Sequence, residues 1–329
     1  MTLDLHHEDR LKIKKGKKTT TAILDLAESE KMIRPGQIGM FEEVLDALQA
    51  KHGQEVEIYL KEKPISVRYI KKKLDGHELK EKELYEIVRA ISKRELTDIE
   101  ESYFVASSYI YGLNTKETYY LTKAMIKTGD CLKLPDKIIL DKHCTGGVAG
   151  NRTTPLIVPI ITAAGYVMPK TSSRAITSPA GSADTIEVFT PVTFNIKKMK
   201  EIIKKVRGCF VWGGALNLAP SDDHIIRVEA PLSIDAEGQL LASILAKKGS
   251  VSANHVLIDI PLGKETKIKN KQVAKRLRKK FIKLGKKLGM KIKVILTNGN
   301  EPIGNGIGPA LEAIDIFKVM RRDPDRPLD

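Results

Sequence analysis

Hydrophobic and polar residues follow two different patterns in the N-terminal part of this chain. Residues 1–62 alternate short apolar runs such as LKI, TTTAILDLA and VEIYL with charged residues, which predicts a small β-rich module. One helix is predicted within it, near residues 42–51. Residues 64–128 repeat apolar positions at helical spacing instead, so a helical region is predicted to follow the module.

Boundary signals divide this helical region into separate helices. Amphipathic spacing covers residues 66–74 and 81–92. Thr97 and Glu100 form a capping-box pattern ahead of a helix that reaches Tyr111. A further helix is predicted from Thr115 to Gly129, because glycine commonly ends helices.

Residues 137–189 contain a unit of strand, polar loop and helix that occurs twice. The first strand is predicted at 138–140 and is followed by the loop DKHCTGGVAGNRTT, after which Thr154 and Pro155 begin a long apolar helix. The second strand, at 166–169, leads into the loop KTSSRAITSPAGSAD and another helix. The chain is organised around this repeated unit.

The two loops have the composition of anion-binding turns. Backbone N–H groups at a helix N-terminus are unpaired and carry partial positive charge, and glycines let an anion approach them closely. Lys142 and Arg174 add full positive charge to the two loops. Neighbouring parallel strands would place both loops at one edge of the sheet. Neither loop matches a Walker A or GxGxxG pattern, so nucleoside-triphosphate and dinucleotide sites are not indicated.

The remainder of the chain continues the alternation of helices and strands. A basic amphipathic helix is predicted at 195–208, and strands are predicted around HVLIDIPLG and MKIKVIL. A helix at 236–248 places Gln239, Ser243 and Lys247 at steps of four on one face. This polar face either lines a cleft or lies on the surface, and the pattern alone favours neither.

The net charge of +15 is concentrated in one stretch. Residues 264–293 hold fourteen lysines and arginines and one acidic residue. Apolar residues recur there at helical spacing, at Val273, Leu277, Phe281, Leu284 and Leu288. We expect a covering helix with a solvated basic face. Nucleic acid is not an expected partner, because no aromatic residues are interleaved with the lysines.

Composition narrows the class of protein further. A hydrophobic content of 42% is that of a globular protein, and no long uncharged apolar run or secretion signal is visible. The three cysteines lack metal-ligand spacing and suit a reducing cytoplasm. The seven histidines are scattered, so neither a metal nor another cofactor is predicted.

The two loops resemble a known signature. DKHCTGG with NRTT is similar to the signature of the thymidine/pyrimidine nucleoside phosphorylase superfamily. KTSSRAITSPAGSADTIEV resembles the AMP phosphorylase branch of that superfamily, whose nucleoside-specific members have a glycine-richer second loop. The resemblance covers essentially the whole chain.

The resemblance implies an α/β fold with a mixed-sheet phosphate-binding lobe and an all-helical lobe, preceded by a small β-rich N-terminal domain. The implied domains are residues 1–62, residues 63–128 with 222–250 as the helical lobe, and residues 129–221 with 251–329 as the α/β lobe. Members of the superfamily continue beyond the last residues, and the first strand or two of their N-terminal domain lack a counterpart here. The chain is therefore expected to be a fragment or a shortened relative.

The resemblance also implies a phosphate site. The residues that match its positions are Lys142, the Cys144 backbone, Thr153, Ser172 and Ser182. Cys144 stands where nucleoside phosphorylases have serine, and its backbone N–H could serve in either case. Ser182 stands where AMP phosphorylases usually have threonine, and it keeps the hydroxyl group.

A nucleoside monophosphate needs a second anion site, and the same resemblance places it at SRAITS. The AMP-contacting positions are Gly147, Ser173, Arg174, Ala175, Ile176, Thr177, Ser178, Ser182, Ser243, Lys247 and Lys267. An arginine fork matches phosphate oxygens well, which favours a monophosphate over a free nucleoside. The alternative for Arg174 is a salt bridge that stabilises the loop.

Asp235 matches the proton donor of AMP phosphorylases. As an acid near neutral pH it would need a pKa raised by burial. The alternative is a surface aspartate that caps a helix, which the sequence SIDAEG also fits.

The resemblance implies that AMP and inorganic phosphate are converted to adenine and ribose 1,5-bisphosphate, with CMP and UMP as further substrates. A homo-oligomer, dimeric or larger, is expected in the cytoplasm, with no membrane partner. Two alternatives remain: a pyrimidine nucleoside phosphorylase, and a non-catalytic fragment that binds nucleotides or RNA.

Overall fold

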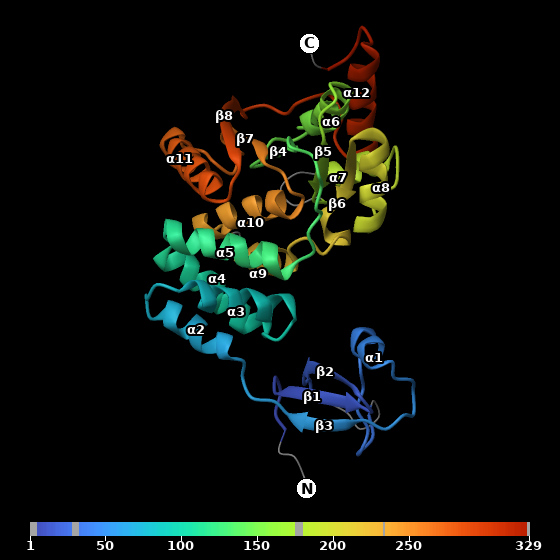
Figure 1. The fold of residues 1–329 in the computed structure, drawn as a ribbon, viewed down its shortest axis with the longest axis vertical. Helices are drawn as coiled ribbons and strands as arrows, with labels where there is room; N and C mark the ends of the chain where they lie inside the picture. The colour runs from blue at the N-terminus through green and yellow to red at the C-terminus, as the bar shows by residue number, and fades with distance from the viewer. Residues whose placement is uncertain (1–4, 28–32, 175–179, 233, 328–329) are drawn as a thin grey trace.

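The computed structural model describes residues 5–27, 33–174, 180–232 and 234–327. Figure 1 shows three bodies in a row: a β-rich module that begins the chain, a layer of helices, and an α/β lobe that contains the last helix. Among the described helices, none combines the length and apolar character that crossing a membrane requires.

The N-terminal module is a small antiparallel sheet with one helix. Its strands are β1 (Arg10–Lys15), β2 (Lys18–Ile23) and β3 (Glu57–Leu60), in the order β2-β1-β3, and its helix is α1 (Glu42–Leu48). Strand β1 alternates buried and exposed residues, so Leu11 and Ile13 pack with Leu48 in a small core. The β-rich module with a helix that the sequence predicts is therefore present.

Arg10 joins this module to the helical lobe. Its side chain is 4% exposed, its Nε donates to the Glu95 carbonyl oxygen at 2.9 Å, and its guanidinium forms an ion pair with Glu100. Glu100 also accepts from the Thr97 backbone N–H, while the Thr97 hydroxyl accepts from the Glu100 backbone N–H. The capping box predicted from the sequence thus forms, and the same carboxylate holds the module.

The helical lobe is built from two separate stretches of the chain. Its helices are α2 (Ile65–Leu74), α3 (Glu81–Ser92), α4 (Asp98–Tyr111), α5 (Thr115–Thr128), α9 (Pro220–Glu229) and α10 (Glu237–Ser250). Ala219, Ile225, Ala242 and Ala246 belong to the same core as Leu84 and the other buried residues of α2–α5. The helices predicted at 66–74, 81–92 and 236–248 are confirmed to within two residues at each end.

The α/β lobe contains parallel strands. Strands β4 (Leu140–Cys144), β7 (His255–Leu262) and β8 (Lys291–Asn298) pair in the order β4-β7-β8, and β5 (Met168–Ser172) pairs with β6 (Gly208–Trp212). A parallel bridge between Ile139 and Val167 places β5 beside β4. The predicted α/β class is confirmed. The sequence predicts a mixed sheet in this lobe, whereas its described strand pairs are all parallel and the antiparallel pairs lie in the N-terminal module.

Helices cover this sheet (Figure 1). They are α6 (Thr153–Ala163), α7 (Ser182–Glu187), α8 (Ile196–Val206), α11 (Lys271–Lys287) and α12 (Pro309–Arg321), with short 3₁₀ turns at Gly213–Ala215 and Ala230–Leu232. Leu277, Phe281 and Leu284 of α11 are buried in the core of the lobe. The apolar stripe that the sequence predicts within the lysine-rich stretch is therefore confirmed.

Both strands that precede the polar loops differ from their predicted positions. The sequence predicts strands at 138–140 and 166–169, whereas β4 and β5 continue to Cys144 and Ser172. Residues that look like loop, DKHC and KTS, are thus strand residues. Charged side chains are tolerated there because buried ion pairs compensate them, as the next subsection describes.

Gly129 ends α5 as predicted, but for a different reason. Its φ is −105°, so the left-handed conformation is not what requires glycine. A Cβ atom at this position would lie 2.9 Å from the backbone of Asn217 and Ala219. Close by, the Asp130 N–H donates to the Asn217 carbonyl at 2.9 Å and the Leu132 N–H to the Ser250 carbonyl at 2.7 Å. The chain segments that connect the two lobes are therefore hydrogen-bonded to one another.

Candidate active site

The carboxyl ends of β4 and β5 open into a cleft of about 480 Å³ between the α/β lobe and helices α9 and α10. Most of the predicted site residues line it: Lys142, Cys144, Gly147, Ser172, Ser173, Arg174, Ser182, Asp235, Ser243, Lys247 and Lys267. The two loops predicted from the sequence therefore face one common space. Ala175, Ile176, Thr177 and Ser178 lie outside the described residues.

Lys142 is held rigidly at the first loop. It is 4% exposed, its Nζ donates to the Thr153 hydroxyl at 3.0 Å, and it lies 3.4 Å from an Asp259 carboxylate oxygen. Thr153 is the first residue of α6, so this contact fixes an ammonium group beside a helix N-terminus. The combination suits an oxyanion.

Cys144 is the last residue of β4, directly before the first loop. Burial raises the pKa of its thiol above the ordinary value, while nearby Lys142 lowers it and Asp259 raises it. The thiol is therefore protonated at neutral pH and adds no negative charge where an anion would bind. The Asn151 side-chain amide nitrogen lies 3.5 Å from its sulfur.

Gly147 has a structural role that the sequence did not indicate. The resemblance assigns it to direct contact with the substrate. In the structure its φ is +86°, and a Cβ atom would lie 2.6 Å from the Thr266 Cα and 2.8 Å from the Lys267 nitrogen. Glycine is therefore required because the first loop packs against the backbone that carries Lys267.

Arg174 in the second loop is compensated by carboxylates. Its Nη1 donates to Asp184 at 2.8 Å and to Glu187 at 2.6 Å, and its guanidinium lies 4.8 Å from the centre of the Trp212 ring. The loop salt bridge considered from the sequence is thus present. Arg174 also lines the cleft, so the salt bridge and a ligand-binding role are compatible.

Arg152 connects the two loops, and sequence reasoning gave it no role. It is buried, and its Nη2 donates to the Ala180 carbonyl of the second loop at 2.6 Å. Its Nε donates to the Thr185 hydroxyl at 3.0 Å and forms an ion pair with Glu312 of α12. Nothing in the sequence NRTT marks this arginine as structural, because its partners are distant in the chain.

Asp235 faces Lys267 across the cleft. The Lys267 Nζ lies 3.0 Å and 3.1 Å from the two Asp235 carboxylate oxygens. The helix-cap alternative is wrong, since α10 begins at Glu237 with Ala236 at the cap position and no side-chain cap bond. The burial expected of a proton donor is absent, because the Asp235 side chain is 43% exposed.

The polar face of α10 lines the cleft. Gln239, Ser243 and Lys247 all contribute to its wall, so the cleft-lining alternative for this face is confirmed. The Lys247 Nζ lies 2.6 Å from Asp222, which is 1% exposed. Burial lowers the pKa of Lys247, but Asp222 and Asp223 outweigh it, so the pKa is raised above the ordinary value.

Glu229, at the end of α9, is a cleft residue that the sequence did not single out. Burial, and next the negative charge of Asp235, raise its pKa to about 7. Its Oε1 atom is buried and has no hydrogen-bond partner among the described residues. A carboxyl group in this state can hold a proton near neutral pH.

A cluster of buried lysines was also missed. Lys170 of β5 and Lys248 of α10 line the cleft beside Lys142, and both contact the buried Asp141. In the sequence, Lys142 and Lys170 each follow a predicted strand closely, and the pattern places both in loops. Nothing more in the sequence indicates that they are buried.

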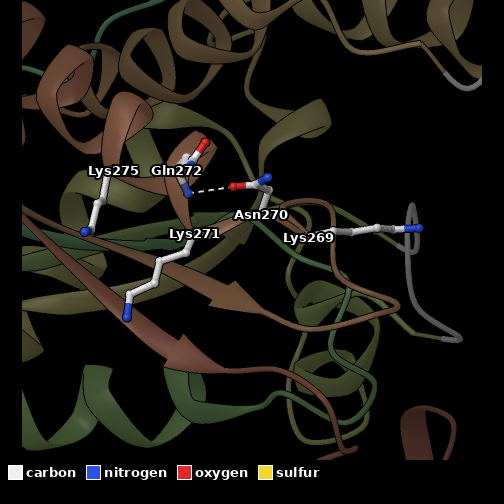
Figure 2. Close-up of a pocket in the computed structure, with 5 residues that line it drawn as sticks. All are labelled: Lys269, Asn270, Lys271, Gln272 and Lys275. Atoms are coloured by element: carbon white, nitrogen blue, oxygen red, sulfur yellow. Dashed lines mark hydrogen bonds between the residues drawn. The ribbon is translucent and has the colours of Figure 1, made fainter.

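A second hollow, of about 680 Å³, lies at the start of α11 (Figure 2). Asn270 caps this helix, and its Oδ1 accepts from the Gln272 N–H at 2.6 Å. Lys269, Lys271 and Lys275 also line the hollow, but Figure 2 shows the Lys269 side chain extending away from the other two. No common ligand position results, so the chemistry lies in the cleft between the lobes.

Comparisons with known proteins assign the fold. A family model described as glycosyl transferase family, helical bundle domain, matches residues 67–129, and one described as glycosyl transferase family, a/b domain, matches residues 136–246. Together they account for more than half of the chain. This chain belongs to the glycosyl transferase family.

Relatives within this glycosyl transferase family include the AMP phosphorylases of Methanococcoides burtonii, 46% identical over 97% of this chain, and of Thermococcus kodakarensis, 48% identical over 96%. A protein of Legionella pneumophila (strain Corby) named "Putative thymidine phosphorylase" is 42% identical over 98%. The chain spans 62% of the length of each of these relatives.

A solved structure shares the glycosyl transferase fold at low identity. The anthranilate phosphoribosyltransferase of Thermus thermophilus superimposes with a TM-score of 0.64 and 19% identity, covering 79% of this chain and 84% of that one. At this level of identity the similarity concerns the fold alone. It supports the arrangement of a helical bundle beside an α/β lobe.

Proposed function

We propose that the cleft binds AMP and inorganic phosphate and that the protein is an AMP phosphorylase, which forms adenine and ribose 1,5-bisphosphate. The observation that carries this proposal is the 46–48% identity to proteins named AMP phosphorylase along nearly the whole chain. The cleft geometry supports it, since cationic and hydroxyl side chains of two loops line one space.

The reaction requires a fixed phosphate. A phosphate oxygen attacks C1′ of the ribose, the N-glycosidic bond breaks, and its electron pair leaves with the base. Lys142, Thr153 and the Cys144 N–H are the proposed donors from the first loop, and Ser172 and Ser182 are those from the second. Such preorganised donors in a poorly hydrated site stabilise the charge that develops in the transition state.

The monophosphate assignment rests on Arg174. With Ser173, Thr177 and Ser178, it is the proposed ligand of the AMP 5′-phosphate. In the structure Glu187 and Asp184 hold its guanidinium fork at the cleft. Because the Glu187 side chain is 40% exposed, an entering phosphate can replace it at the fork, and a dianion is the stronger partner.

The base is proposed to lie on the helical-lobe side of the cleft, against Ser243 and Lys247, while Lys267 of the α/β lobe is a further proposed AMP contact. Asp235 would protonate the base as it departs. The Lys267 Nζ contacts both Asp235 carboxylate oxygens, so the acid role requires the bound base to separate this pair. Glycosidic bond cleavage and proton transfer are thereby linked to occupancy of the cleft.

The wider proposal follows the same resemblance. CMP and UMP are further substrates, the protein is a homo-oligomer, and it acts in the cytoplasm. Three free thiols, Cys131, Cys144 and Cys209, are consistent with a reducing compartment. The phosphate binds to the α/β lobe and the base to the helical lobe, so closing of the lobes would exclude water during the reaction.

The test is release of adenine from AMP by the 329-residue chain with and without phosphate. We expect adenine only when phosphate is present, with equimolar ribose 1,5-bisphosphate detected by ³¹P NMR, and much slower reaction of adenosine. The M. burtonii AMP phosphorylase serves as the positive control. Binding of AMP without turnover, under conditions where that enzyme is active, would support the non-catalytic alternative.

A pyrimidine nucleoside phosphorylase is the second candidate, and the L. pneumophila relative is the observation in its favour. Turnover of thymidine or uridine faster than that of AMP would support this candidate instead.

A further inference from the structure

Lys170 is a buried cation in the cleft that the proposed mechanism does not use. It lies on β5, three residues after Val167, which bridges to Ile139 directly before β4, while Lys142 lies three residues after Ile139. The two lysines are 6% and 4% exposed, and both line the cleft. Two neighbouring strands therefore each direct one ammonium group into the same confined region.

The buried lysines Lys142, Lys170 and Lys248 share two carboxylates, Asp141 and Asp259. Asp141 is shared, because its Oδ2 accepts from Lys248 Nζ at 2.5 Å while its Oδ1 lies 3.6 Å from Lys170 Nζ. Lys142 has Asp259 as its partner. Among the described residues, the carboxylate contact of Lys170 is a longer one, to a group that Lys248 already holds, so in this part of the chain three buried lysines share two carboxylates.

The groups that face Lys170 come from every neighbouring element. They are Asp141, Lys142 and His143 of β4 and Lys248 of α10, while the Cys209 thiol of β6 contacts the Lys170 backbone. Asp259 of β7 pairs with Lys142, and the charge of Lys247 acts on His143. Burial lowers the pKa of Lys170 to about 7, with Asp141 opposing and Lys248 adding to this shift. Burial and the lysines hold the pKa of His143 well below its ordinary value, and burial raises that of Cys209 to about 12. Of Lys170, His143 and Cys209, Lys170 has the pKa that lies near neutral pH.

We propose that Lys170 is a further oxyanion ligand of the phosphate pocket, and that it gains a proton when the oxyanion binds. The bound dianion supplies negative charge next to Lys170, and this charge stabilises the ammonium form of the side chain. This inference rests on the proposed function only in taking the cleft as a phosphate site. It adds a ligand and a proton-coupled step to that site.

Sulfate is the probe, because it is a dianion that does not itself titrate near neutral pH. Titration calorimetry of the full chain at pH 7.5, in buffers of different ionisation enthalpy, measures protons taken up per sulfate bound. With Lys170 mostly neutral beforehand and mostly charged afterwards, we expect uptake of about 0.5 proton. Sulfate affinity should also fall by about tenfold in total as the pH rises from 6.5 to 9.

Two variants distinguish the effect of the positive charge at position 170 from the effect of its protonation. Lys170→Met should bind sulfate about tenfold more weakly at pH 6.5 and take up almost no proton. Lys170→Arg stays charged at every pH, so it should keep the affinity and lose the uptake. Lys197→Met, at an exposed lysine of α8, is the matched control and should behave like the unaltered chain. Thermal unfolding of each variant shows that it is folded.

The inference is overturned if the unaltered chain binds sulfate without proton uptake, if Lys170→Met keeps both affinity and uptake, or if no sulfate binds at millimolar concentrations. Turnover of AMP is a separate measurement. Proton-coupled sulfate binding in a chain that does not release adenine would sustain the oxyanion site and contradict the proposed reaction.

Discussion

Lys267 and Asp235 form an ion pair that crosses the cleft, with Nζ 3.0 Å and 3.1 Å from the two carboxylate oxygens. Lys267 follows β7 in the α/β lobe, and Asp235 precedes α10 in the helical lobe. Because Gly147 packs against the Lys267 backbone, the first anion loop is in contact with the residue that holds Asp235. The proposed phosphate site and the proposed proton donor are therefore joined through one short segment.

Replacing Asp235 by asparagine should remove the acid without disturbing the fold. We expect kcat for AMP to fall by about 100-fold or more, the usual loss when a general acid is removed. The unfolding free energy should change by less than about 1 kcal/mol, since this ion pair is partly exposed. Steady-state kinetics and urea unfolding measure the two effects.

Lys267→Met is the companion variant. It leaves Asp235 in place and removes a proposed AMP contact, so KM for AMP should rise more than kcat falls. An Asp235→Asn enzyme with unchanged kcat would exclude Asp235 as the proton donor.

Replacing Arg174 by alanine should distinguish the monophosphate from the nucleoside reaction. Loss of a charge-assisted fork to the 5′-phosphate should lower kcat/KM for AMP by about 30-fold to 100-fold. Uridine lacks this phosphate, so its turnover should change by less than about threefold. Arg321→Ala, at an exposed arginine of α12, is the control. If both substrates suffer alike, Arg174 is not a phosphate ligand.

Arg152 should matter for stability more than any exposed arginine. Arg152→Met leaves the buried Glu312 carboxylate without its ion-pair partner, which should cost about 3–5 kcal/mol of unfolding free energy. Arg276→Met breaks an exposed pair with Glu237 and should cost less than about 1 kcal/mol. Denaturant unfolding compares the two.

Adding Glu312→Gln to Arg152→Met should recover part of the lost stability, because the buried charge is then removed as well. A double variant as unstable as the single one would show that the cost comes from packing alone.

Local signals in the sequence predicted much of the fold. Thr97 and Glu100 lie three residues apart, and their capping box forms as expected. The apolar stripe of α11 can be recognised from the spacing of its apolar residues alone. Such features depend on residues that are close in sequence, which is why the helices were placed accurately.

Features that depend on distant partners were missed. Lys142 and Lys170 looked like loop residues because charged side chains seldom occupy buried strands. Their burial becomes possible through Asp259 and Asp141, the first of them more than a hundred residues from Lys142. Arg152 was overlooked for the same reason, since Glu312 lies far along the chain. Spacing along a sequence does not reveal such pairs.

Stability should depend on pH through Glu229. Burial raises its pKa from 4.5 to about 7 in the folded protein, so the folded state binds a proton that the unfolded state releases between these values. Stability therefore falls as pH rises from 4.5 to 7, and the loss persists above pH 7.

Glu229→Gln removes this cost. We expect it to raise the unfolding free energy by about 1 kcal/mol at pH 8, since solvent still reaches part of the side chain, and to change it little at pH 5. Glu62→Gln, at an exposed glutamate, is the control. An equal effect of Glu229→Gln at both pH values would contradict the raised pKa.

The helical lobe is assembled from helices on both sides of the first α/β strands, with α9 and α10 sharing the core of α2–α5. During synthesis, α2–α5 therefore leave the ribosome more than a hundred residues before the last helix that completes their core. Their apolar faces stay uncovered until translation has passed Ser250. The strands β4, β5 and β6 emerge within this interval, but β7 and β8 follow Ser250, so the helical lobe can complete its core before the α/β lobe completes its sheet.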